Sequence, residues 1–65
     1  ERKIRGELRD GPLTAWEVTV RLFPRAPPAA MFLTVSEALA NLEVLEDRGE
    51  VVRAEEGDLL RFRLR

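Results

Sequence analysis

Residues 11–18 read Gly11-Pro12-Leu13-Thr14-Ala15-Trp16-Glu17-Val18. Gly11 can adopt the left-handed backbone conformation that ends a helix, and Pro12 cannot continue that helix because it has no amide hydrogen. Thr14 and Glu17 match the T-x-x-E capping box, in which each side chain satisfies a backbone amide at a helix start. The stretch therefore predicts the end of one helix and the beginning of another.

A hydrophobic staple supports the same helix start. Leu13 and Val18 occupy the two positions at which apolar side chains pack together around a capped first turn. We expect the new helix to begin near Ala15 and to cover residues 15–23, because Pro24 cannot continue it.

The apolar residues of this helix fall into two stripes. The stripe at i, i+3 and i+7 consists of Ala15, Val18 and Leu22 and matches the inward face of a helix-turn-helix. The second stripe, at i, i+4 and i+7, consists of Trp16, Val20 and Phe23. A domain of this size has only a small core, so the second stripe needs cover from elsewhere.

We expect this second stripe to be an interface, because aromatic anchors dominate interface energetics. Trp16, Val20 and Phe23 are predicted to bury against another domain or a second subunit. Val44 is a weaker candidate, on the polar face of the following helix.

The remaining helices can be placed from periodicity and helix-ending residues. A short helix is expected over residues 1–10, where Ile4 and Leu8 share one face. Residues 24–30 are proline-rich and predict a stiff connector. A long helix is expected from about Pro28 to Arg48, and its core stripe consists of Val35, Ala38, Leu39, Leu42 and Leu45.

Both ends of the long helix carry local signals. Gly49 is expected to end it as the C′ residue. A second T-x-x-E pair, Thr34 and Glu37, is interpreted as a cap, so a start near Thr34 is the alternative to Pro28.

Residues 50–55 and 59–65 predict a β-hairpin around Glu56-Gly57-Asp58, since apolar residues alternate with arginines in the second strand. A two-residue Glu56-Gly57 turn would pair Val51 with Phe62, and a three-residue turn would pair Val52 with Phe62. We favour the first.

These elements predict an α+β fold, mainly helical, of the winged-helix type, with three helices and a hairpin wing. Residues 1–65 are expected to form a single domain, with Leu13 able to add a short third strand. The side chains expected to be among the most buried are Leu22, Leu39, Leu42 and Phe62.

Composition excludes several classes of function. The 65-residue chain has no histidine and no cysteine, which removes the usual zinc ligands, and its net charge is −1. We predict no catalytic, cofactor-binding or metal-binding residue. No apolar run is expected to span a membrane, and a cytoplasmic location is expected. The chain starts at Glu1 inside an expected helix, so we interpret it as a piece of a longer polypeptide.

Two groups of charged residues, one acidic and one basic, can each be interpreted either as a binding site or as an ordinary solvent-exposed surface. Glu55, Glu56 and Asp58 could bind a divalent cation, but a solvated hairpin tip is favoured. Arg61, Arg63 and Arg65 are favoured as the solvent face of an edge strand, with an auxiliary contact to RNA phosphates as the alternative.

The run Pro12-Leu13-Thr14-Ala15-Trp16-Glu17-Val18, within residues 11–24, resembles the second helix of the C-terminal winged-helix domain of metallo-β-lactamase-fold hydrolases. Residues 36–51 resemble the third helix and first wing strand of that domain. One difference is Thr19, which stands where the family usually has a small alanine between helices.

The resemblance implies a non-catalytic accessory domain that docks on a catalytic domain and shapes substrate access. The zinc-binding histidines of the family would lie in that other domain. The alternative is the DNA-binding winged helix of a transcription regulator. Glu37, Glu43 and Asp47 on the exposed face of the long helix make duplex DNA an unfavourable partner. A second copy of the same chain, forming a homo-oligomer, is a further possible partner.

Overall fold

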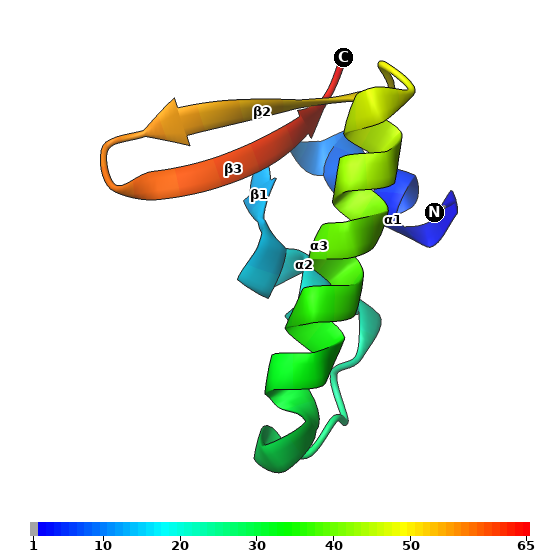
Figure 1. Cartoon of the computed structure of the whole chain (residues 1–65), viewed down its shortest axis with the longest axis vertical. Helices are drawn as coiled ribbons and strands as arrows, with labels where there is room; N and C mark the ends of the chain where they lie inside the picture. The colour runs from blue at the N-terminus through cyan, green and yellow to red at the C-terminus, as the bar shows by residue number, and fades with distance from the viewer. Residues whose placement is uncertain (1) are drawn as a thin grey trace.

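The computed structural model describes residues 2–65, which form three α-helices, two 3₁₀ turns and a three-stranded antiparallel sheet. In chain order the elements are α1 (Arg2–Glu7), η1 (Leu8–Asp10), β1 (Leu13–Thr14), α2 (Ala15–Leu22), η2 (Pro28–Ala30), α3 (Met31–Asp47), β2 (Val51–Glu56) and β3 (Leu59–Leu64). Figure 1 shows α3 as the long axis of the molecule, with the sheet across its C-terminal end and the β2–β3 hairpin projecting to one side. The α+β class is confirmed.

The predicted helix start is confirmed in detail. The Thr14 backbone amide donates to Glu17 Oε1 at 2.8 Å, and the Glu17 amide donates to Thr14 Oγ1 at 3.1 Å. Leu13 and Val18 lie in one buried cluster, as the staple requires. Gly11 ends the preceding turn with φ 140° and ψ 177°, which is an extended conformation open to glycine and not the left-handed helical one expected.

The end of α3 is also as predicted. Gly49 has φ 76°, and its amide donates to the Glu46 carbonyl at 3.0 Å. The Glu50 amide donates to the Leu45 carbonyl at 3.0 Å, which completes a Schellman motif. This reversal directs the chain from α3 into β2.

The start of the long helix follows the favoured alternative, because η2 begins at Pro28 and leads directly into α3. The interpretation of Thr34 and Glu37 as a cap is wrong. Thr34 lies inside α3, and its hydroxyl donates back to the carbonyls of Ala30 and Met31. A T-x-x-E pair caps a helix only where the threonine is extended, and the upstream proline turn had already started the helix here.

The sheet has the order β1–β3–β2, so β1 is the short third strand that Leu13 allowed. The favoured register is wrong. The turn is Gly57-Asp58, with Gly57 at φ 63°, and it pairs Arg53 with Phe62 and Val51 with Leu64. Glycine at the first central position suits a tight hairpin turn. The three arginines therefore belong to a central strand and its end, and not to an edge strand.

The core lies where α1, α2, the C-terminal half of α3 and the sheet meet. Its buried apolar residues are Ile4, Leu8, Leu13, Val18, Ala38, Leu42, Leu45, Val51 and Phe62. Leu42 and Phe62 are as buried as predicted, but Leu22 and Leu39 are only partly buried because they pack on the edge of this cluster. Thr19 is fully buried, and its hydroxyl donates to the Ala15 carbonyl at 2.8 Å.

The expectation that no segment approaches a membrane span is wrong by length and composition. Pro28–Asp47, formed by η2 and α3, has 20 residues and contains an 18-residue window with a mean hydropathy of 1.2, enough to cross a membrane by length and composition only. Ala38, Leu42 and Leu45 of this segment lie in the core of the domain, while 17% of its apolar window as a whole is buried.

Candidate docking surface

The second stripe of α2 lies on the surface of the domain. Trp16 is 55% exposed, and Val20 and Phe23 are also exposed. The capping box fixes where α2 begins, and the helical repeat then turns these three side chains away from Val18, which is fully buried. The domain's own residues cover only part of the stripe, since Val20 remains 42% and Phe23 39% exposed.

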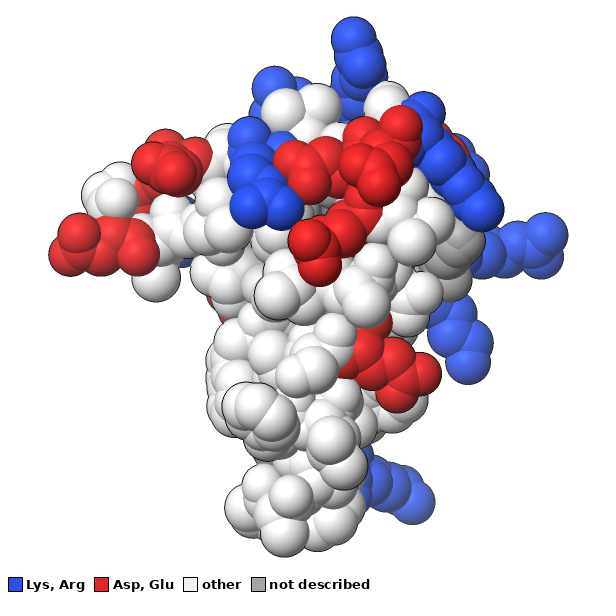
Figure 2. All heavy atoms as spheres, viewed as in Figure 1, with Lys and Arg blue, Asp and Glu red and all other residues white. Residues whose placement is uncertain are grey.

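A second apolar site lies at the start of α3, and sequence reasoning missed it. Phe32 is 80% exposed and Leu33 is 70% exposed, the highest values among the large apolar side chains that the structure describes. A signal was available in the sequence, since residues 22–36 contain a single charged residue, Arg25. Figure 2 shows the corresponding lower half of this face nearly free of charge, whereas the upper half is densely charged.

We call Trp16, Val20, Phe23, Phe32 and Leu33 the apolar surface. Scattered apolar side chains are common on protein surfaces, but three exposed aromatic residues within 17 positions of one small domain are unusual. Such side chains suit a buried interface.

Val44, the weaker candidate, is exposed but stands apart from this surface. It shares a helix face with Leu33, but 11 residues of α3 separate the two by about 16 Å. Its immediate surroundings are polar, since Glu37, Glu43 and Asp47 of α3 are all exposed. Val44 is therefore separated along α3 from Phe32 and Leu33 and has polar neighbours on its own helix.

The acidic hairpin tip has no metal-site geometry. Glu56 pairs with Arg61 across the hairpin, while Glu55 and Asp58 are exposed to solvent. Within residues 2–65, no group of three or more histidine, cysteine, aspartate or glutamate side chains could hold a metal ion. The arginines also serve structure, because Arg63 donates to the Leu64 carbonyl at 3.2 Å.

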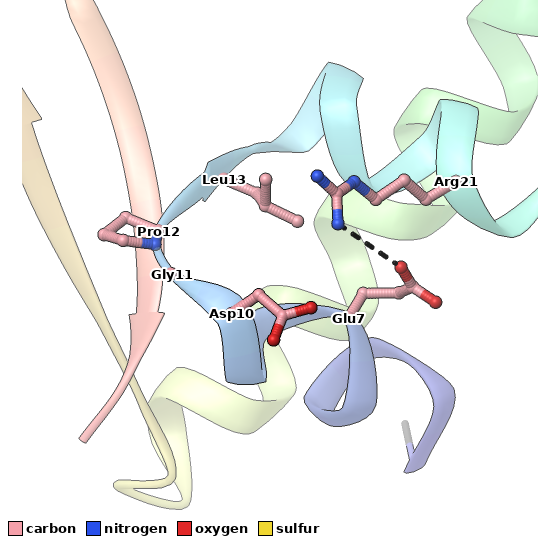
Figure 3. Close-up of a pocket in the computed structure, with 6 residues that line it drawn as sticks. All are labelled: Glu7, Asp10, Gly11, Pro12, Leu13 and Arg21. Carbon is pink, nitrogen blue, oxygen red and sulfur yellow. Dashed lines mark ion pairs between the residues drawn. The ribbon is translucent and has the colours of Figure 1, made fainter.

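A polar hollow of about 180 Å³ lies between η1, β1 and α2. Figure 3 shows Glu7 and Arg21 pointing toward one another beside it, and their Oε1 and Nη1 atoms are 3.7 Å apart. Asp10, Gly11, Pro12 and Leu13 complete the lining. Arg21, the cationic residue in this lining, is already paired with the Glu7 carboxylate. We therefore interpret the pair as a contact between α1 and α2 and not as a catalytic or ligand-binding site.

Two ionisable groups have shifted pKa values, and both are structural. The Thr14 backbone amide that bonds the Glu17 carboxylate lowers the pKa of Glu17 below its ordinary value. The hydrogen bond to Glu46 raises the pKa of Arg53. Neither group has the arrangement of a general acid or base, since each is held by a fold contact.

Comparison with known families decides the identity. The family profile described as "Metallo-beta-lactamase-like, C-terminal domain" matches residues 2–65. The chain belongs to this family. Metallo-β-lactamase-like C-terminal domains thus account for essentially the whole of the described structure, and the resemblance noted in the sequence is confirmed.

Two relatives support this assignment. This metallo-β-lactamase-like C-terminal domain is 35% identical over 60 residues to the probable metallo-hydrolase YqjP of Bacillus subtilis, covering 92% of the chain and 19% of YqjP. A crystal structure of a beta-lactamase domain protein from Burkholderia ambifaria superposes with a TM-score of 0.86 at 27% identity, covering 98% of the chain and 20% of that protein. The chain spans about a fifth of each relative's length.

Proposed function

We propose that this chain is the non-catalytic, winged-helix accessory domain of a longer, cytoplasmic metal-dependent hydrolase of the metallo-β-lactamase fold. It docks on the catalytic domain and helps to shape substrate access. The observation that carries the proposal is the exposed apolar surface on a domain whose relatives are about five times its length.

The element order supports the winged-helix description. A helix, a short strand, two further helices and a hairpin follow one another, and the short strand joins the hairpin in one sheet. In a winged helix that binds DNA, the last helix enters the major groove. Here that helix exposes Glu37, Glu43 and Asp47, which favours contact with protein over contact with phosphates.

The chemistry of the hydrolase lies outside this chain. A zinc ion in the catalytic domain would supply an activated water for hydrolysis. The residues here do not fit such an ion, because the chain has neither histidine nor cysteine and its described acidic side chains form no ligand cluster. The contribution of this domain is therefore positional.

Burial of the apolar surface supplies the docking energy. Trp16 and Phe32 come from different helices, so a partner that covers both contacts α2 and α3 at once and fixes the orientation of the domain. Aromatic anchors of this kind commonly cost about 2 kcal/mol or more on truncation at interfaces.

Trp16 is the only tryptophan of the chain, which makes it a probe of docking. In the 65-residue chain its fluorescence should be readily quenched by acrylamide. In the longer polypeptide that includes the catalytic domain, labelling tryptophan with fluorine should show the Trp16 resonance protected from solvent. Trp16→Ala and Phe32→Ala should increase proteolysis between the domains while leaving the bound metal content unchanged.

Leu59→Ala is the matched control, because Leu59 is an exposed apolar residue at the hairpin tip, outside the apolar surface. If Leu59→Ala loosens the domain as much as Trp16→Ala, or if Trp16 is equally accessible in both polypeptides, the docking proposal fails. Protection of Trp16 only at high concentration of the 65-residue chain would instead indicate a homo-oligomer.

A further inference from the structure

A second hollow, of about 460 Å³, lies beside α1, on a part of the molecule that the apolar surface does not include. It is lined by Arg2, Arg5, Gly6, Arg9 and Leu64. Its volume falls in the range of small-molecule sites. The lining contains three guanidinium groups and no carboxylate.

The helical repeat explains why the arginines gather there. Arg2, Arg5 and Arg9 are spaced i, i+3 and i+7, so they share one face of α1 and η1. Ile4 and Leu8 occupy another face and anchor the segment in the core, where both are buried. The cationic face is therefore held in place by the fold.

Only part of this charge is compensated. Arg5 Nη1 pairs with Glu50 Oε1 at 3.0 Å, which both neutralises one charge and orients the guanidinium. Within residues 2–65, Arg2 and Arg9 make no ion pair with a carboxylate. Among the described residues, two of the three guanidinium groups at the hollow therefore have no carboxylate partner.

Gly6 forms an open part of the hollow. A Cβ atom at Gly6 would meet nothing within 4 Å, so packing does not require glycine in the interior of this helix. The missing side chain lets a ligand approach the helix backbone between the arginines. Leu64 offers an apolar contact on the strand side.

We propose that this hollow binds a small molecule carrying a phosphate or diphosphate group. Arginine presents a planar fork of donors that matches phosphate oxygens bidentately, and two unpaired guanidinium groups match the charge of a phosphate dianion. A single carboxylate would leave one of these charges uncompensated. The role is separate from docking, since no residue of the apolar surface lines the hollow.

The test is a nuclear magnetic resonance titration of the ¹⁵N-labelled 65-residue chain with sodium phosphate and sodium pyrophosphate, against sodium chloride at equal ionic strength. Saturable amide shifts centred on Gly6, Arg9 and Leu64 are expected with both phosphates and not with chloride. Arg2→Gln combined with Arg9→Gln should weaken binding at least about ten-fold, because each charge-assisted contact is lost.

Two further variants separate the site from general charge effects. Gly6→Leu should obstruct the hollow without altering charge, and leucine is a better helix former than glycine. Arg25→Gln removes one exposed charge far along the chain and should leave affinity within about two-fold.

The proposal is overturned if the shifts do not saturate, or if Arg25→Gln weakens binding as much as the double variant. It is also overturned if Gly6→Leu has no effect. A ten-nucleotide RNA that binds with shifts spread over the hairpin arginines, while pyrophosphate does not bind, would indicate a nucleic-acid surface instead.

Discussion

Arg53 donates two hydrogen bonds of 2.9 Å to the Glu46 carboxylate, from Nε to Oε2 and from Nη2 to Oε1. This pair ties β2 to the last turns of α3. The Arg53 guanidinium carbon also lies 5.4 Å from the centroid of the Phe62 ring, directly across the sheet. An exposed arginine thereby links the end of α3, β2 and the buried Phe62 ring of β3.

The bidentate geometry predicts that Arg53→Lys lowers the melting temperature, since lysine cannot make two parallel hydrogen bonds. The decrease should be smaller than for a core truncation, because the pair is partly exposed to solvent. Thermal unfolding followed by circular dichroism measures it. Arg63→Lys is the control, and an equal effect there would show that the Glu46 contact adds nothing.

The Glu17 cap predicts a specific dependence of stability on pH. Its folded pKa is lowered, mainly by the Thr14 backbone amide, so the ionised form stabilises the fold. That contribution is fully present above the unfolded pKa of about 4.3 and is lost as the pH falls through the lower folded value. Glu17→Gln should therefore flatten the fall in unfolding free energy below about pH 4.3, measured by urea titration. If Glu17→Gln and the unchanged protein lose unfolding free energy equally at acid pH, the prediction is contradicted.

Leu42→Ala should destabilise the domain by about 2–5 kcal/mol, because it opens a cavity at a fully buried position. Stability of so small a domain is limited, so much of the population could unfold. Leu39→Ala, at a partly buried position on the same helix, should have a clearly smaller effect. Urea unfolding compares the two, and equal losses would contradict the position of the core.

The exposed face of α3 predicts no sequence-specific binding to duplex DNA. Glu37, Glu43 and Asp47 would face phosphates of like charge if this helix entered a major groove. A mobility-shift titration at physiological salt should show no sequence-dependent complex. Tight binding that is abolished by changes on this helix would favour the regulator alternative.

Short-range signals decided most of the secondary structure. The capping box at Thr14, the positive φ of Gly49 and the alternation around Phe62 each depend on a few neighbouring residues. For the same reason, helical periodicity alone showed that the α2 stripe containing Trp16 has more apolar residues than a small core can bury. Thr34 shows the limit of such signals, because the same T-x-x-E pattern lies inside a helix that began earlier.

The sequence by itself determined the capped start of α2, the glycine end of α3, which helix faces are apolar, and that zinc ligands of the usual kind are absent. Tertiary structure decided the pairing of Arg53 with Phe62, the exposure of Phe32 and the placement of Leu64 beside the arginines of α1 and η1. The physical reason is the distance along the chain between the residues that interact. Capping and periodicity depend on neighbours within a turn or two, whereas strand register, exposure and the meeting of α1 with β3 depend on which distant segments pack together.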